Sequence, residues 1–128
     1  MYYCPSDLRD VFVKGQKSLF ARFAIIDTDR HHGNGTRDIF LEDDDVLHVC
    51  FCSWDRIEGN GKKICVNIAS PQTDESYMEK VEKALIPRLR DFRLDMILHN
   101  LGHDTCQLDY GDIGLTEGLF QRSQEIYV

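Results

Sequence analysis

The sequence lacks the features by which membrane proteins and nucleic-acid-binding proteins are usually recognised. No apolar run approaches the roughly 20 residues that a membrane helix needs, and no cationic stretch leads into an apolar segment at the start. Acidic residues outnumber basic ones, 22 against 15, whereas a nucleic-acid backbone is held by clustered Lys and Arg. We therefore expect a cytoplasmic protein that binds neither membranes nor nucleic acids.

Internal repeats and low-complexity tracts are also missing. A length of 128 residues suits a single domain, residues 1–128, better than two. A chain of this size can bury a modest hydrophobic core.

An even set of cysteines is missing as well. The chain has five, and without a secretory signal this odd number argues against a disulfide framework. Cys50 and Cys52 are two residues apart in an apolar run, so they share one face of a predicted strand. We interpret them as buried thiols of the core. With His48 they could form a second metal site, but no further ligand is spaced to complete it.

Apolar runs and helical spacings alternate along the chain. Short runs that are apolar throughout predict buried strands, and apolar residues three or four apart predict helices. The predicted strands are 23–26, 46–52, 64–68 and 94–98, and the predicted helices are 6–20, 36–41, 76–92 and 116–127. Pro87 is expected to kink or shorten the third of these helices.

This alternation indicates a parallel sheet with helices on both faces. We therefore predict an α/β fold with three layers, α/β/α, around a mainly parallel sheet. In such sheets, ligands bind at the carboxyl ends of the strands. The loops that follow 23–26 and 94–98 are expected to open on the same edge.

The first of these loops carries candidate metal ligands. Asp29 and His31 can direct a carboxylate oxygen and an imidazole nitrogen at one point, and both are common zinc ligands. A catalytic zinc ion has three protein ligands and an open position for water. The third ligand must come from another segment, and Asp109 in the second loop is our candidate.

Neighbouring residues would complete such a site. Asp27 is expected to support it from behind or to bind an alkali cation, while Gly33 and Gly35 would let the backbone pass close by. On these residues alone, a loop of solvated carboxylates and structural histidines remains the alternative.

The segment from Asp27 to Thr36 (Asp-Thr-Asp-Arg-His-His-Gly-Asn-Gly-Thr) closely resembles the zinc loop of the histone deacetylase and acetoin-utilization protein family. Further stretches resemble that family in the same order, namely 39–40 with 45–49, 66–68, and 101–104 with Asp109 and 115–116. The resemblance runs from about residue 23 to 127 and corresponds to the central portion of the family's domain. It implies a truncated arginase–deacetylase-like fold.

Site residues can be carried over from this resemblance one by one. The implied zinc ligands are Asp29, His31 and Asp109. Fe²⁺ or Co²⁺ could replace Zn²⁺ in such a mixed set of ligands. A K⁺ site is implied at Asp27, and Cys50 stands where the family usually has a Ser of that site. His32 would pack behind the loop without touching the zinc.

The reaction implied by the resemblance is hydrolysis of an acetylated amine, such as acetyl-lysine, an acetylpolyamine or a similar small molecule. The family takes its general base from a His pair upstream of the zinc loop, and its oxyanion donor from a Tyr in a downstream Gly-rich loop. No histidine precedes Asp27 in this sequence, and it ends at Val128 without such a loop. Neither catalytic residue is therefore assigned.

Three interpretations of this missing machinery stay open. The chain is a piece of a longer product, a shortened member that binds a metal or ligand without catalysis, or one of two chains that complete each other. A shortened parallel sheet would expose an edge, which favours a homo-oligomer. The two-manganese arginase branch is disfavoured, because its loop resembles Asp-Xaa-His-Xaa-Asp, whereas His31 follows Asp29 here.

Overall fold

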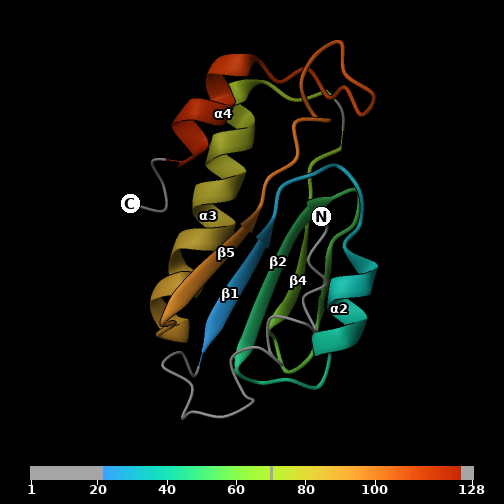
Figure 1. Ribbon diagram of the computed structural model, residues 1–128. Helices are drawn as coiled ribbons and strands as arrows, with labels where there is room; N and C mark the ends of the chain where they lie inside the picture. The colour runs from blue at the N-terminus through green and yellow to red at the C-terminus, as the bar shows by residue number, and fades with distance from the viewer. Residues whose placement is uncertain (1–21, 70, 125–128) are drawn as a thin grey trace.

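The computed structural model describes residues 22–69 and 71–124, so the predicted helix 6–20 lies outside the described residues. One five-stranded sheet has the order β3-β4-β2-β1-β5, with β3 antiparallel to β4 and the other neighbours parallel (Figure 1). The strands are β1 Phe23–Asp27, β2 Val46–Cys52, β3 Arg56–Glu58, β4 Lys63–Asn67 and β5 Met96–Asn100, and the helices are α2 Asn34–Phe40, α3 Asp74–Phe92 and α4 Glu117–Gln124. Over these ranges, no helix has the length and apolar character needed to cross a membrane.

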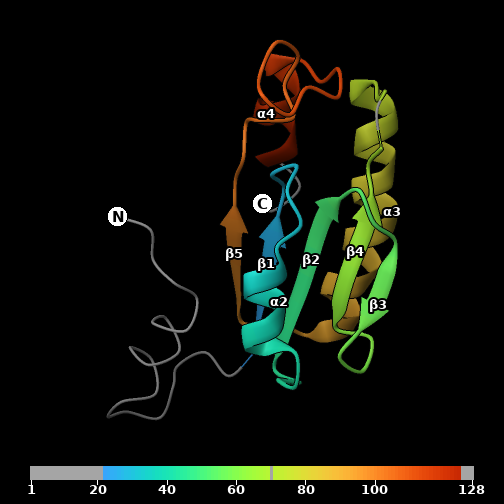
Figure 2. The same cartoon turned by 90° about the vertical axis from the view of Figure 1, so that its right-hand side faces the viewer.

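The helices cover both faces of the sheet, as predicted (Figures 1 and 2). The larger core joins one face of the sheet to α3 and to Leu119 of α4, and it includes Leu47, Val49 and Phe51 of β2. On the opposite face, Phe40 of α2 packs with Ile25 and Val46. Because side chains alternate along a strand, the remaining residues of β2 on the α2 face are His48, Cys50 and Cys52. This face of β2 is therefore buried, but it carries an imidazole and two thiol groups.

Two strands differ most from the sequence prediction, while β1 and β4 differ from it by one residue at one or both ends. β3 was not predicted, since it has only three residues and its apolar residue Ile57 is 62% exposed. β5 begins two residues later than predicted, at Met96, because Leu94 packs against the core in the connection after α3. It then continues through the polar His99, whose ring lies 2.9 Å from the hydroxyl of Thr28.

α3 begins with a capping box. The Thr73 hydroxyl accepts a hydrogen bond from the Ser76 amide, and the Ser76 hydroxyl accepts one from the Thr73 amide. Pro87 does not end the helix, which continues to Phe92. Arg93 then adopts a left-handed conformation with φ of 52°, and the chain turns back toward β5.

Candidate metal centre

The two loops expected to share one edge of the sheet do so. Asp27 ends β1, Asn100 ends β5, and these two residues are register partners in the parallel pair. The Thr28 amide donates to the Asn100 carbonyl at 3.1 Å, which joins the loops at their start. Both loops leave the sheet at the arrowhead end of the strands in Figure 1.

Three possible ligands from these loops lie together: Asp29, His31 and Asp104 offer ligand atoms that are all within 4.8 Å of one another. The Nδ1 atom of His31 is 3.0 Å from Asp104 Oδ2 and 3.9 Å from Asp29 Oδ1. The His31 side chain is 63% exposed, so the group opens to solvent. Two carboxylates crowded around one imidazole nitrogen repel each other, and a divalent cation would relieve that repulsion. The ligand types and their arrangement therefore fit a metal ion with an open position.

Asp104, and not Asp109, is the residue of the second loop beside Asp29 and His31. Asp109 is exposed, and its carboxylate accepts a hydrogen bond from the following amide, that of Tyr110, at 2.6 Å. The structure thus differs from the sequence prediction for the third ligand. A signal for Asp104 was present in the sequence: it follows Asn100 by four residues, just as His31 follows Asp27, and those strand ends are paired.

The second loop packs directly against the first. The backbone amide of Arg30 donates to Asp104 Oδ1 at 3.0 Å, and the Arg30 guanidinium donates to the carbonyls of Gly111 and Asp112. At Gly102, an added Cβ would lie 2.2 Å from the Cβ of Asp29. These contacts hold Asp104 against the first loop and leave no room for a side chain at position 102.

Asp27, the expected support residue, is buried behind this group. Burial, followed by the charge of Asp29, raises the pKa of Asp27 to about 6. Burial also raises the pKa of Asp29. Asp27 Oδ1 lies 3.4 Å from the amide of Asp29. A buried carboxylate with a raised pKa is a group that a bound cation would stabilise in its charged form.

The glycines of the first loop differ in role. An added Cβ at Gly33 would lie 2.7 Å from Asp27 Oδ2, so the expected close approach occurs there. At Gly35 nothing lies within 4 Å, so the expectation is wrong for that residue.

Cys50 and His32 lie on the inner side of the loop. The Cys50 sulfur accepts a hydrogen bond from the Gly33 amide at 3.3 Å and lies 3.7 Å from the His31 carbonyl oxygen. The His32 ring turns away from Asp29, toward the sulfurs of Cys52 and Cys65. The two adjacent histidines therefore face different surroundings.

The other histidines have separate environments. His103 packs edge-on against Phe120, with ring centroids 4.9 Å apart. His48 is fully buried, and burial together with the charge of Arg37 lowers its pKa to about 4. Within the described ranges, neither ring nitrogen of His48 has a hydrogen-bond partner.

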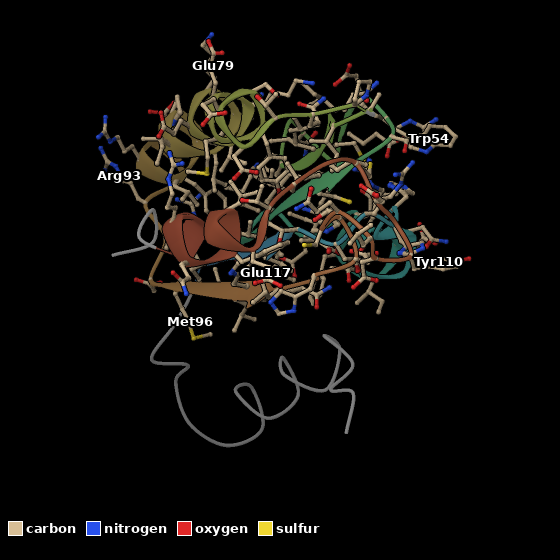
Figure 3. All side chains as sticks on the ribbon, turned by 90° about the horizontal axis from the view of Figure 1, so that it is seen from above. Trp54, Glu79, Arg93, Met96, Tyr110 and Glu117 are labelled. Carbon is tan, nitrogen blue, oxygen red and sulfur yellow. The ribbon has the colours of Figure 1, made fainter. Side chains whose placement is uncertain are left out.

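Two exposed aromatic side chains flank the loop. The ring of Tyr110 stacks on His31 with centroids 6.2 Å apart, and the ring of Trp54 stacks on His32 at 5.9 Å. Figure 3, which looks onto the molecule from above, shows Trp54 and Tyr110 projecting from the same side. Tyr110 gives the open edge of the metal group an apolar border, whereas Trp54 lies against the neighbouring His32.

Comparisons with known proteins point to one family. A family model described as a histone deacetylase domain matches residues 11–127. A probable deacetylase of Archaeoglobus fulgidus is 33% identical over 100 residues, which are 69% of this chain and 28% of that protein. Histone deacetylase HDA1 of Saccharomyces cerevisiae is 32% identical over 69% of this chain and 15% of its own length. The chain therefore spans less than a third of these two relatives.

Solved structures give the same result. The crystal structure of an acetylpolyamine aminohydrolase from Burkholderia pseudomallei matches with a TM-score of 0.75 and 28% identity. That match covers 84% of this chain and 36% of the other. The histone deacetylase Clr3 matches with a TM-score of 0.72 and 25% identity, over 84% of this chain and 21% of the other.

Proposed function

Because this chain belongs to the histone deacetylase family, we propose that it is a metal-dependent hydrolase of acetylated amines with Asp29, His31 and Asp104 as zinc ligands. The observation that carries the proposal is the meeting of these three side chains from two loops at one edge of the sheet. Fe²⁺ or Co²⁺ could occupy the same ligands. The assignment of Asp104 replaces the sequence-based choice of Asp109.

The residues around the group have distinct tasks in this proposal. A bound zinc ion would polarise the acyl oxygen and lower the pKa of a water molecule at the open position. Asp29 and Asp104 orient the His31 ring by facing its Nδ1 atom. Arg30 holds the second loop in place through its three hydrogen bonds to that loop. Asp27 would hold a K⁺ ion behind the first loop, where burial raises its pKa.

The proposed substrate is an acetylated amine such as acetyl-lysine or an acetylpolyamine. Relatives that the chain matches are named a deacetylase and an acetylpolyamine amidohydrolase. The net charge of −7 favours a cationic substrate. Tyr110, which stacks on His31, would contact the aliphatic part of such a molecule beside the metal.

A second candidate is a metal-binding module that does not turn over a substrate. It is favoured by the positions of the other histidines, since His48 is buried and His103 packs on Phe120. Neither stands beside the three proposed ligands as a general base would.

Replacing Asp104 by Asn tests the ligand assignment, with Asp109→Asn as the matched control. Asp104→Asn removes a charged ligand and is expected to weaken zinc binding at this site at least about 100-fold. Asp109→Asn makes the same chemical change five residues away and should leave the affinity unchanged. Zinc content after dialysis and calorimetric titration measure both. Loss of zinc in Asp109→Asn with retention in Asp104→Asn would overturn the assignment.

The activity is tested on acetyl-lysine peptides and acetylpolyamines, with and without a chelator. Chelator-sensitive release of acetate, absent in Asp104→Asn, is the expected result. A chain that binds zinc at Asp104 but releases no acetate would leave the metal site standing and identify the binding module as the correct function.

A further inference from the structure

A second group of possible metal ligands lies where the first loop meets β2 and β4. Cys50 and Cys52 point to the same face of β2, and Cys65 on β4 is the register partner of Cys50. His32 approaches them from the loop. The ligand atoms of these four residues lie within 4.8 Å of one another. Three sulfurs and one imidazole nitrogen make up a Cys₃His set, which is one of the known structural zinc combinations.

The observed distances suit a tetrahedral ion. Zinc bonds of about 2.3 Å to sulfur and about 2.0 Å to nitrogen place tetrahedral S and N ligands about 3.5 Å apart. The Nδ1 atom of His32 is 3.3 Å from Cys65 Sγ and 3.7 Å from Cys52 Sγ. Little movement of the ring or the sulfurs is therefore needed to place an ion between them.

Charge separates this group from ordinary core thiols. Cys50, Cys52 and Cys65 are at most 3% exposed, and the Arg37 guanidinium, also 3% exposed, donates to Cys65 Sγ at 2.7 Å. Neutral thiols are weak hydrogen-bond acceptors, so they compensate only a small part of the free energy that a guanidinium loses when its hydration is removed. Three thiolates, one neutral imidazole and a divalent ion would carry a net charge of −1, and the arm of Arg37 that donates to Cys65 Sγ would stabilise that charge. The other arm of Arg37 pairs with Glu58, which is partly exposed.

We propose that Cys50, Cys52, Cys65 and His32 bind a second metal ion, a zinc or another thiophilic cation, at a site separate from Asp29, His31 and Asp104. Four protein ligands fill a tetrahedral shell, so this site is closed and structural, unlike the open group on the other side of the loop. The Trp54 ring stacks on the His32 ring. Binding requires the thiols to lose their protons, which are released to solvent.

The site would join three segments of the fold. A metal here ties β2 to β4 and fixes the first loop to both through His32. It does not depend on the proposed hydrolase activity, because none of its ligands belongs to the open group.

Cobalt replacement tests the proposal on the intact 128-residue chain without any variant. Cobalt bound by thiolates gives an intense charge-transfer absorption in the near ultraviolet, whereas carboxylate and imidazole ligands do not. Under reducing conditions, the wild-type chain is expected to show this band and to hold about two metal equivalents. Absence of the band in folded, reduced protein would overturn the proposal.

Four variants then separate the two sites. Cys65→Ser and Cys52→Ser are each expected to lose the band and one equivalent of metal. Asp29→Ala should lose one equivalent and keep the band. Cys106→Ser is the matched control, because this cysteine lies outside the group and should change neither reading. A band that persists in Cys65→Ser or disappears in Cys106→Ser would refute the assignment. If a serine variant does not fold, chelator-dependent exposure of three thiols in the wild-type chain gives the same answer.

Discussion

Gly102 shows how closely the two loops of the open metal group are packed. An added Cβ would approach both the Cα and the Cβ of Asp29, at 2.6 and 2.2 Å, and these atoms cannot swing aside as a flexible side chain would. A residue larger than glycine must displace one loop from the other. Asp104, two residues later, would move with it.

Gly102→Ala is therefore expected to weaken zinc binding at Asp29, His31 and Asp104 by about tenfold or more, and to destabilise the fold by about 1–3 kcal/mol. Gly35→Ala is the control, because nothing lies within 4 Å of its added methyl group. It should leave zinc binding unchanged and stabilise α2 slightly, since alanine is the better helix former. Equal zinc affinities in the two variants would contradict the close packing described for Gly102.

His48 is a second residue whose effect on the free energy of unfolding can be measured. Its buried ring nitrogens have no partner within the described residues, and an unsatisfied buried polar group costs about 1–3 kcal/mol. His48→Leu keeps a similar volume and removes the polar atoms. We expect the variant to be about 1 kcal/mol more stable than the wild type at pH 7.5 by denaturant unfolding.

The advantage of His48→Leu should grow in acid. The folded chain holds the pKa of His48 at about 4, against 6.5 for an ordinary histidine. Between these values the unfolded chain binds a proton that the folded chain does not, so the wild type loses stability as the pH falls through this window. At pH 5 this loss is about 2 kcal/mol. A constant difference between wild type and variant from pH 7.5 to pH 5 would show that His48 is not buried in neutral form.

Residue-level prediction from the sequence was uneven for a physical reason. Asp29 and His31 follow one strand within a dense motif, so their shared direction could be read from a single segment. Asp104 and Asp109 both lie in a long polar loop, where spacing alone does not say which carboxylate turns inward. The choice depends on Arg30 and Gly102, which join this loop to another one more than 70 residues away in sequence.

At the scale of elements, α3 carries opposite features at its two ends. Thr73 caps the first turn by a hydrogen bond to the Ser76 amide, whereas Arg93 ends the helix in a left-handed conformation that suits glycine better. Thr73→Ala should destabilise the fold by about 1 kcal/mol. Arg93→Gly should stabilise it by about 0.5–1 kcal/mol, because glycine adopts positive φ without strain. Thermal unfolding measures both, and shifts of the same sign would contradict this description of the helix ends.

Strands and helices were predictable where burial is strong. β2 has the predicted bounds because all seven of its residues are buried and all but His48 are apolar. β3 is short and exposed, and it is recruited by pairing with β4, a contact that no local pattern encodes. The start of β5 is set by the turn at Arg93 and by the Asp95 amide, which donates to the carbonyl of Arg22. These are tertiary constraints, so the sequence pattern placed the strand two residues early.

For the whole molecule, the two proposed metal sites make stability depend on zinc. A ligand at a hundred times its dissociation constant adds about 2.7 kcal/mol to the folded state at each site. We expect a chelator to lower the melting temperature of the wild-type chain, and the double variant Asp29→Ala with Cys65→Ser to be insensitive to it. The single variants should each lose part of the response. A wild-type melting temperature that is the same with zinc and with chelator would contradict both sites.

The different surroundings of the His31 and His32 rings restrict how the length of this segment can vary in evolution. One ring faces Asp29 and Asp104, while the ring of the very next residue faces Cys52 and Cys65. An insertion or deletion of one residue between Asp27 and His31 would move both rings out of their places, so that at most one of them would still face a metal group, and that the wrong one. Descendants that keep both sites must therefore keep the number of residues in this segment.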